Sequence, residues 1–499
     1  MQNVFRKQEH TMSYTQKLFG ADGRDKFRHF FSIMLPILIT QTAIMGMNFF
    51  DTVMSGHAGA EQLAGTSIGS SLWMPVFTTI NGILIASTPL TAHLLGARKR
   101  NETGRVIRHG LCLSLLFSCL CFMAGAFLLQ PLLQQFQLEP QVAHVAFYYL
   151  AGIGIGIIPF FMGIVLRSFI DTLGGTRLTM QVYLAALPVN AALNYILIFG
   201  KLGLPALGGI GAGIGTGLTC WLIFGLFAFI IRRHPQYRDI QIFPARPGTG
   251  EKTIGHSAAT KDPSGETKSA ILRPEPFLSR ALLEEYLRIG IPIGLSIFME
   301  TSIFGVVAFL LTRFGTIAIA ASEASMNFAG LIYMIPLSVS MSMTILIGIE
   351  AGAHRWITAE QYENVGLAFN WSCALILPFL CYLLRYPIAS LYVTEPEVLE
   401  VCVRFLVYGC FFIMCDAVAA PIQGILRGYK DVNAPFYSGL IAYWVICMPL
   451  GLFLDYKLGH GPYSYWQSLD IGLVASALIL FFRLRYVRKK IRRGNHVSA

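Results

Sequence analysis

The segment 164-IVLRSFID-171 returns about 260 residues later as 424-GILRGYKD-431, with Arg167 aligned to Arg427 and Asp171 to Asp431. Two further pairs keep nearly the same spacing: 187-LPVNAALNY-195 matches 448-MPLGLFLDY-456, and 95-LGARK-99 matches 351-AGAHR-355. Weak internal similarity of this kind marks a duplicated architecture. The chain is therefore expected to consist of two related halves.

The composition indicates a membrane protein. Of the 499 residues, 54% are hydrophobic and only 13% are charged, whereas a soluble chain averages about 25% charged residues. Several apolar stretches exceed the roughly 20 residues that a helix needs to cross a bilayer. We predict an all-α polytopic membrane protein with twelve spans near residues 29–55, 64–95, 106–132, 143–169, 178–200, 208–231, 286–312, 319–350, 363–387, 399–426, 434–456 and 466–484.

One long polar segment divides the spans into two sets of six. Residues 232–285 are rich in Pro, Gly, Ser, Thr and charge, so they cannot bury a core and are predicted to form a cytoplasmic linker. Because six is even, the second half enters the membrane in the same direction as the first, which gives a pseudo-two-fold axis along the membrane normal. The predicted segments are 1–28 (N-terminal segment), 29–231 (first lobe), 232–285 (linker), 286–484 (second lobe) and 485–499 (basic tail).

The positive charge follows the predicted topology. The formal net charge is +11, but 33 of the 38 Lys and Arg residues fall on the side of the N-terminus when the spans alternate. Loops on the cytoplasmic side carry this excess. We therefore expect a multi-pass protein of the cell membrane with both termini cytoplasmic, in contact with lipid and with no nucleic-acid partner.

The sequence shows no pattern typical of an enzyme or of a cofactor site. The ten cysteines and eleven histidines have no metal-ligand spacing, and no catalytic triad or phosphate-binding loop is present. The glycines of 208-GGIGAGIGTG-217 open a hydrophobic span and follow no strand, so close helix packing explains them. Arg167, Asp171, Arg427 and Asp431 lie at the ends of spans, where topology and helix capping suffice to explain them. We expect no enzymatic activity and no cofactor.

An acid interrupts the first span, in 47-MNFFDTVMSGH-57. A charged residue at a helix centre in the bilayer costs roughly 2.5 to 3.5 kcal/mol on insertion scales, and such residues usually face the interior of a bundle and carry function. Asp51 shares a helical face with Asn48 and Ser55. Asn190 and Asn194 lie one turn apart in the fifth span and are its expected partners. The alternative is a carboxylate that only bridges helices.

Two more acids interrupt the second half. Glu300 lies in the seventh span, and Asp416 lies in the tenth, where Pro421 loosens the helix a little more than one turn later. A desolvated carboxyl group can take up a proton near neutral pH, and two carboxylates with neutral oxygens can hold Na⁺. The alternative is a structural acid pair that shares a proton. Apolar side chains near the acids are candidates for an adaptable pocket: Met47, Phe50, Phe298, Met299 and Phe412.

The string 49-FFDTVMSGHAGAEQLAG-65, then 75-PVF-77, 88-TPLTAHLLGARK-99 and the two LRS/LRG-x-x-D segments resemble the multidrug and toxic compound extrusion (MATE) family. Glu300 and Asp416 make the chain similar to its bacterial NorM-type branch. The resemblance implies two six-helix lobes in a V that export cationic, amphipathic compounds in exchange for Na⁺ or H⁺.

By motif position, Asp51 resembles the family's first-span acid, and Glu300 and Asp416 resemble the acids of a C-lobe cation site. Asn190 and Asn194 resemble the polar pair around the first acid, and Thr216 completes that cluster; some relatives carry an acid in place of Asn194. Phe412 stands near the place where some relatives carry a hydroxyl-bearing aromatic residue.

The leading hypothesis is thus a secondary active antiporter that works by alternating access, as a monomer. A flippase for lipid-linked precursors of related architecture is the alternative, but it calls for several Arg or Lys residues in the cavity, and the spans contain almost none. A channel is a third alternative, and the absence of a repeated filter-like loop counts against it.

Overall fold

The computed structural model describes residues 22–136, 138–240, 242, 278–392 and 395–495. All regular elements within these ranges are helical. Twelve helical stretches in the described chain are long and apolar enough to cross a membrane, one for each predicted span. The first begins at Gly23 and the last ends at Asn495, so parts of the predicted N-terminal segment and basic tail are helical. Most of the predicted linker, residues 243–277, lies outside the described residues.

The first lobe, or N-lobe, contains the elements up to residue 242 of the described chain. Its second span is made of two helices, α4 and α5, separated by Ile85 and Ala86. The elements are α3 (Gly23–Ala58), α4 (Ala60–Leu84), α5 (Ser87–Gly96), η1 (Arg100–Glu102), α6 (Thr103–Gln135), α7 (Pro140–Thr172), α8 (Thr176–Phe199), α9 (Gly209–Arg233) and η2 (Pro235–Tyr237).

The second lobe, or C-lobe, contains the remaining elements. Its eleventh span is composite, because a π-helical segment, Leu440–Cys447, joins two short α-helices. The elements are α10 (Arg280–Leu311), η3 (Thr312–Phe314), α11 (Thr316–Gly352), α12 (Trp356–Leu383), α13 (Arg385–Tyr392), α14 (Pro396–Gly428), α15 (Asn433–Gly439), η4 (the π segment), α16 (Met448–Tyr456) and α17 (Tyr463–Asn495).

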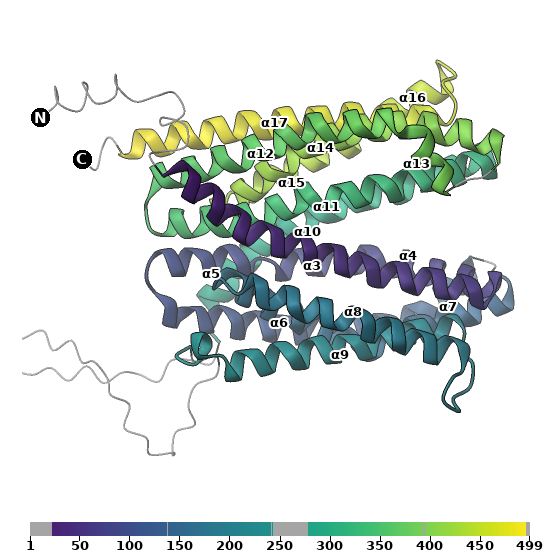
Figure 1. The fold of residues 1–499 in the computed structure, drawn as a ribbon, viewed down its shortest axis with the longest axis horizontal. Coiled ribbons are helices and arrows are strands. Elements are labelled where there is room, and N and C mark those ends of the chain that lie inside the picture. Colours follow the sequence, from purple (N-terminus) through teal and green to yellow (C-terminus); the bar gives the residue numbers. More distant parts are fainter. Residues whose placement is uncertain (1–21, 137, 241, 243–277, 393–394, 496–499) are drawn as a thin grey trace, which may run out of the picture.

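The two lobes lie side by side, and α3 crosses obliquely between them (Figure 1). We call the end of the bundle where α3 begins and α17 ends the terminal end, and the opposite end the far end. The first half of α3 belongs to the core of the C-lobe, where Phe30, Met34 and Ile37 pack with residues of α11, α12 and α14. The second half packs along α8 in the N-lobe.

Helix α10 makes the reciprocal exchange. Its Tyr286, Ile289 and Ile293 are buried in the core of the N-lobe, and the Tyr286 hydroxyl donates to the carbonyl of Leu84 at 2.8 Å. Both exchanged helices contain a proline, Pro36 in α3 and Pro292 in α10. Each lobe therefore depends on a half-helix from the other, which keeps the two lobes joined at the terminal end.

At the terminal end, corresponding residues of the two repeats touch each other. A Cβ placed on Gly96 of α5 would lie 2.0 Å from the Ile349 carbonyl oxygen, and one placed on Gly352 of α11 would lie 2.2 Å from the His93 carbonyl oxygen. In the register of 95-LGARK-99 and 351-AGAHR-355, Gly96 corresponds to Gly352 and His93 to Ile349. The contact is thus nearly symmetric about the pseudo-two-fold axis, and only glycine allows so close an approach of two backbones.

The two turns beside this contact have the same backbone conformation. Arg98 and His354, which correspond in the same register, both have positive φ, at 59° and 56°. A second glycine crossing packs the exchanged half of α10 into the N-lobe, where a Cβ on Gly82 of α4 would lie 2.6 Å from the Cα of Gly294 in α10. The contact between Gly96 and Gly352 closes the terminal end of the structure.

The substitution Gly352→Ala should push the lobes apart at the terminal end, because a methyl group there meets a carbonyl oxygen of the other lobe. We expect spin labels at Asn101→Cys and Ile357→Cys, in a background without the ten native cysteines, to show longer distances in the variant than in the parent. Gly305→Ala on α10 is the control, because nothing lies within 4 Å of its added Cβ. Equal distance distributions for both variants would contradict a closing role for this contact.

Candidate functional site

The N-lobe site is built around the carboxylate of Asp51 in α3. Asn194 of α8 donates from Nδ2 to Asp51 Oδ1, and Thr216 of α9 donates from Oγ1 to Oδ2 at 2.7 Å. Asn190 lies one turn from Asn194, which also donates to its Oδ1 at 3.4 Å. Three helices thus converge on one half-buried acid, and their donors satisfy both of its oxygens.

Close packing in α9 fixes the orientation of this cluster. Asn194 is fully buried, and its Oδ1 has no hydrogen-bond partner among the described residues. A Cβ on Gly215 would lie 2.3 Å from that oxygen, so glycine makes room for the amide. Asn190 donates to Thr219 Oγ1 at 3.4 Å, a residue that the sequence analysis did not select. Thr219 lies one helical turn after Gly215, on the face of α9 that meets α8.

The other residues predicted near Asp51 lie outside this hydrogen-bonded set. The Asn48 side chain is exposed, and only its backbone carbonyl accepts a hydrogen bond, from Thr52 Oγ1 at 3.0 Å. Ser55 is fully buried, without a partner for its hydroxyl in the described chain. Met47 is buried and Phe50 is half-buried. Asn48 and Ser55 stand about 20° apart around the helix axis, on the same side of Asp51, but about 10 Å apart along it.

The C-lobe site is built around two carboxyl groups, one from α10 and one from α14. Asp416 of α14 is buried, with 4% of its surface exposed, and Glu300 of α10 is partly buried. The two groups lie within electrostatic range of each other. Neither carboxyl group accepts a hydrogen bond from a described side chain, in contrast with Asp51. Two carboxylates that repel each other favour a bound proton or cation between them.

Two tyrosines that the sequence analysis did not select complete the C-lobe site. Tyr333 of α11 and Tyr443 of the π segment each lie within electrostatic range of both Glu300 and Asp416. Single π-helical turns occur frequently at functional sites, because they rotate the side chains that follow. Phenolic hydroxyl oxygens can act as neutral ligands to a hard cation. Tyr333 and Tyr443 thus supply hydroxyl groups that Phe412 lacks.

The predicted apolar residues of the C-lobe divide into two groups. Phe412 is buried in the lobe core, between the rings of Phe304 at 5.7 Å and Trp466 at 6.4 Å. Phe298 and Met299 are half-buried on α10, next to Glu300. Of the three, only Phe298 and Met299 keep exposed surface that a ligand could contact.

The two lobes also match one family model, called MatE, at residues 36–196 and 292–453. The chain is 42% identical over 475 residues to "Probable multidrug resistance protein NorM" of Halalkalibacterium halodurans, covering 95% of this chain and 97% of that one. It is 40% identical over 476 residues to the protein of the same name in Bacillus subtilis, covering 95% and 99%. This chain belongs to the MatE family. The resemblance found in the motifs is thereby confirmed.

Solved MATE structures have the same fold. The outward-facing conformation of a multidrug resistance MATE family transporter superposes with a TM-score of 0.80 at 15% identity, covering 97% of this chain and 99% of that one. The eukaryotic MATE transporter AtDTX14 gives 0.78 at 17% identity, covering 94% and 99%. The predicted all-α fold of twelve spans in two lobes is therefore confirmed, and the chain is a multi-pass membrane protein of the MatE family.

The sequence analysis missed a further acid of this MatE chain, Asp470 in α17. Its Oδ1 is buried and has no partner among the described residues, and Cys410, Cys415 and Cys447 lie within electrostatic range. Asp470 lies near the start of the predicted span 466–484, where it looked like a boundary residue. The criterion applied to Asp51, an acid within an otherwise apolar span, would have found it.

The ion pairs of the repeated acids, Asp171 and Asp431, differ between the two lobes. They correct the prediction that these acids serve as helix caps. Asp171 of the N-lobe is buried, accepts from Thr179 Oγ1 at 2.6 Å and pairs with Arg167 at 3.4 Å. Its C-lobe counterpart, Asp431, pairs instead with Arg483 of α17 at 2.7 Å. Neither acid caps a helix; each ties two parts of its lobe together.

The basic tail extends this terminal-end network of the C-lobe. Arg488 pairs at 2.6 Å with Glu363, which is fully buried and also accepts a hydrogen bond from the Tyr429 hydroxyl. Burial, together with the nearby Glu363 charge, raises the pKa of Tyr429, which lies in the turn after α14. The tail predicted at 485–499 thus serves, in its described part, to hold α17 against α12.

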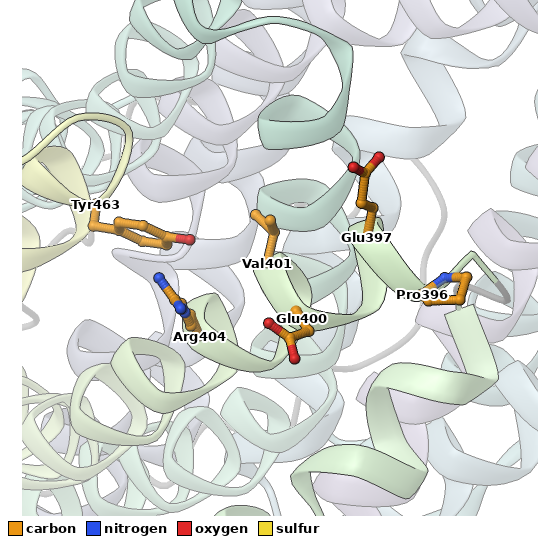
Figure 2. A pocket seen from close by; sticks show the side chains of 6 residues that line it. All are labelled: Pro396, Glu397, Glu400, Val401, Arg404 and Tyr463. Atoms are coloured by element: carbon orange, nitrogen blue, oxygen red, sulfur yellow. The ribbon is translucent and has the colours of Figure 1, made fainter.

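A hollow of about 420 Å³ opens at the far end of the C-lobe. Figure 2 shows Arg404 and Tyr463 on one side of Val401, and Glu397 on the other. Pro396, the first residue of α14, also lines it. Asp416 is 20 residues further along α14, or about 30 Å at 1.5 Å per residue. The hollow is therefore distinct from both acid sites.

The substitution Gly215→Ala should destabilise the N-lobe site, because the added methyl group displaces the Asn194 amide that holds Asp51. Overpacking of this kind costs about 1–3 kcal/mol, so we expect a lower melting temperature in detergent. Gly225→Ala on the same helix is the matched control, since nothing lies within 4 Å of its added Cβ. A melting temperature of Gly215→Ala at or above that of the control would contradict the packing described here.

Proposed function

We propose that this protein is a secondary active antiporter that exports cationic, amphipathic compounds in exchange for Na⁺ or H⁺. The observation that carries the proposal is the presence of one carboxylate site in each lobe. Asp51 accepts hydrogen bonds from α8 and α9 of the N-lobe, and Glu300 and Asp416 lie within electrostatic range of each other in the C-lobe. The relatives named multidrug resistance proteins support the substrate class, and members of the family are transporters, not enzymes.

Alternating access follows from the way the lobes are joined. In this structure the lobes touch at the terminal end through the glycine crossings Gly96–Gly352 and Gly82–Gly294. With both termini in the cytoplasm, as the Lys and Arg distribution supports, this state is closed toward the cytoplasm. Rocking of the lobes about the exchanged halves of α3 and α10 would open the terminal end and close the far end.

Coupling requires that the ion bind the two states with different affinity, because only such a difference shifts their populations. A proton or Na⁺ that neutralises Asp51 removes the charge that Asn194 and Thr216 stabilise, so the three helices lose the interaction that holds them together. At Glu300 and Asp416 the ion has the opposite effect, because it removes repulsion and lets α10 and α14 approach. Each event also removes the negative charge that attracts a cationic compound, which is then released on the far side.

The position of the acid sites in the two lobes also bears on where the substrate binds and on the number of chains required. The substrate would lie between the lobes near Met47, Phe50, Phe298 and Met299, whose flexible or flat apolar surfaces suit varied ligands. Each lobe contains a complete acid site in the single chain, so we propose that a monomer is sufficient. The coupling ion is cargo, and no resident cofactor enters the cycle.

The substitutions Asp51→Asn, Glu300→Gln and Asp416→Asn should each reduce drug efflux. We expect the initial rate of ethidium efflux from everted vesicles to fall at least about tenfold, the effect of roughly 1.4 kcal/mol on a barrier. Each variant is measured with a pH gradient alone and with a Na⁺ gradient alone. A response of the parent protein to only one gradient identifies the coupling ion.

The control for this experiment is Glu139→Gln, which removes an exposed carboxylate between α6 and α7. It should behave as the parent protein does. Full activity of all three acid variants under both gradients would remove these acids from the mechanism. Loss in Asp51→Asn alone would place coupling in the N-lobe and leave the C-lobe pair with a structural role.

A further inference from the structure

Helix α17, which runs along the outer edge of the C-lobe in Figure 1, has a stripe of exposed apolar side chains. The stripe consists of Ile471, Val474, Leu478 and Phe482, which are 48%, 45%, 52% and 62% exposed. At 3.6 residues per turn these four positions fall within about 80° of the helix circumference. On a membrane span, an exposed stripe of this composition faces lipid tails, which are as apolar as the side chains themselves.

The same stripe continues beyond the apolar part of the helix as basic residues. Phe482 is the last apolar residue before a run of Arg and Lys begins, so it marks the edge of the hydrocarbon core. Arg485 and Lys489 follow on the same helical face, and both are exposed. They stand about 5 and 10 Å beyond Phe482 at 1.5 Å per residue. Because lipid headgroups occupy roughly 5–8 Å on each side of the core, both side chains can reach them.

The opposite face of this helical segment is electrically compensated. Three of its arginines turn toward the protein, and each pairs with an acid: Arg483 with Asp431 at 2.7 Å, Arg488 with Glu363 at 2.6 Å, and Arg492 with Glu360. These acids lie in α12 and in the turn after α14. The acids of the C-lobe that contact α17 at the terminal end are therefore occupied by the inner arginines.

The outer cations have no such partners. No ion pair joins Arg485, Lys489, Lys490 or Arg493 to any residue that the structure describes, and Arg485 stacks over the ring of Phe481 at 4.4 Å. Lys489 lies four residues from both Arg485 and Arg493, a spacing at which like charges repel along a helix. This face of α17 thus requires anions from outside the chain.

We propose that the outer face of α17 binds the anionic phospholipid headgroups of the leaflet at the terminal end, with Arg485 and Lys489 on their phosphate groups. A guanidinium binds phosphate through two parallel hydrogen bonds, and an ammonium binds it as a point charge. An anionic leaflet attracts basic segments that lie directly beside a membrane span. Continuity with the apolar stripe selects a lipid over a free anion, because the tails of the same molecule can lie against Leu478 and Phe482.

The bound headgroups also have a structural effect on the C-lobe. They reduce the repulsion between Lys489 and its neighbours, so the end of α17 stays helical. The inner arginines then keep their pairs with Glu363 and Glu360 of α12. Anionic lipid therefore stabilises the terminal end of the C-lobe, and this effect does not depend on the proposed antiport.

The double variant Arg485→Gln/Lys489→Gln should weaken the response of the protein to anionic lipid. The melting temperature of the purified protein in detergent is measured while phosphatidylglycerol or phosphatidylcholine is added. Phosphatidylglycerol should raise the melting temperature of the parent protein more, because only this lipid has a net negative charge. In the double variant, the concentration that gives half of the rise should increase at least about tenfold, since each basic residue near an anionic surface contributes about fivefold in affinity.

Two control variants separate this site from general effects of charge. Lys201→Gln/Lys457→Gln removes two exposed cations at the far end, and it should respond to phosphatidylglycerol as the parent protein does. Arg488→Gln breaks the inner pair with Glu363. It should lower the melting temperature in the absence of lipid but leave the half-maximal phosphatidylglycerol concentration unchanged.

The proposal is overturned if phosphatidylglycerol and phosphatidylcholine stabilise the parent protein equally, or if the double variant keeps the parent's half-maximal concentration. An equal loss in Lys201→Gln/Lys457→Gln would show that any two cations suffice and would also refute the site on α17. Inorganic phosphate is the last comparison. A rise in melting temperature with phosphate alone that requires Arg485 and Lys489 would assign this face to a free anion and exclude the lipid surface.

Discussion

The cost of placing a carboxylate where water cannot solvate it shapes both lobes of this protein. Such a group must be hydrogen-bonded, neutralised or paired, because an isolated charge in an apolar interior is unfavourable by several kcal/mol. The N-lobe meets this requirement with fixed neutral donors, since Asn194 and Thr216 supply hydrogen bonds to both oxygens of Asp51. The C-lobe leaves Glu300 and Asp416 without such donors and close to each other. One site is thus suited to hold a charge, and the other to accept a neutralising ion.

The helix packing of the two repeats is more symmetric than the partners of their polar side chains. The glycine contact at the terminal end repeats in both directions, and the two helices that contain Pro36 and Pro292 exchange their first halves between the lobes. The polar residues on this scaffold have diverged, because Asp171 pairs with Arg167 whereas Asp431 pairs with Arg483. Backbone packing is constrained by both halves at once, whereas a single polar side chain can change without disturbing the crossing of helices.

Much of the fold could be predicted from the sequence, because spans in a bilayer follow from length and hydrophobicity alone. The repeat and the even number of spans per half then gave the parallel arrangement. The N-lobe cluster was also accessible, since isolated acids and amides in apolar helices are few and tend to meet. Asp470 was missed because a span boundary uncertain by a few residues hides an acid near it. Tyr333 and Tyr443 were missed because tyrosines are common in membrane helices, and nothing in the sequence distinguishes those that face an acid.

The amino-acid sequence by itself determined the twelve spans, the division into two six-helix halves and the identity of the acids that interrupt them, because each depends on local hydrophobicity or on similarity between segments. Only the tertiary structure decided which side chains meet. It brought Asn194 and Thr216 to Asp51, left Asn48 exposed, and paired Asp431 with Arg483, on a helix about fifty residues later, instead of Arg427. Such partners depend on how helices cross and rotate against each other, and this packing is set by the whole bundle rather than by any one segment.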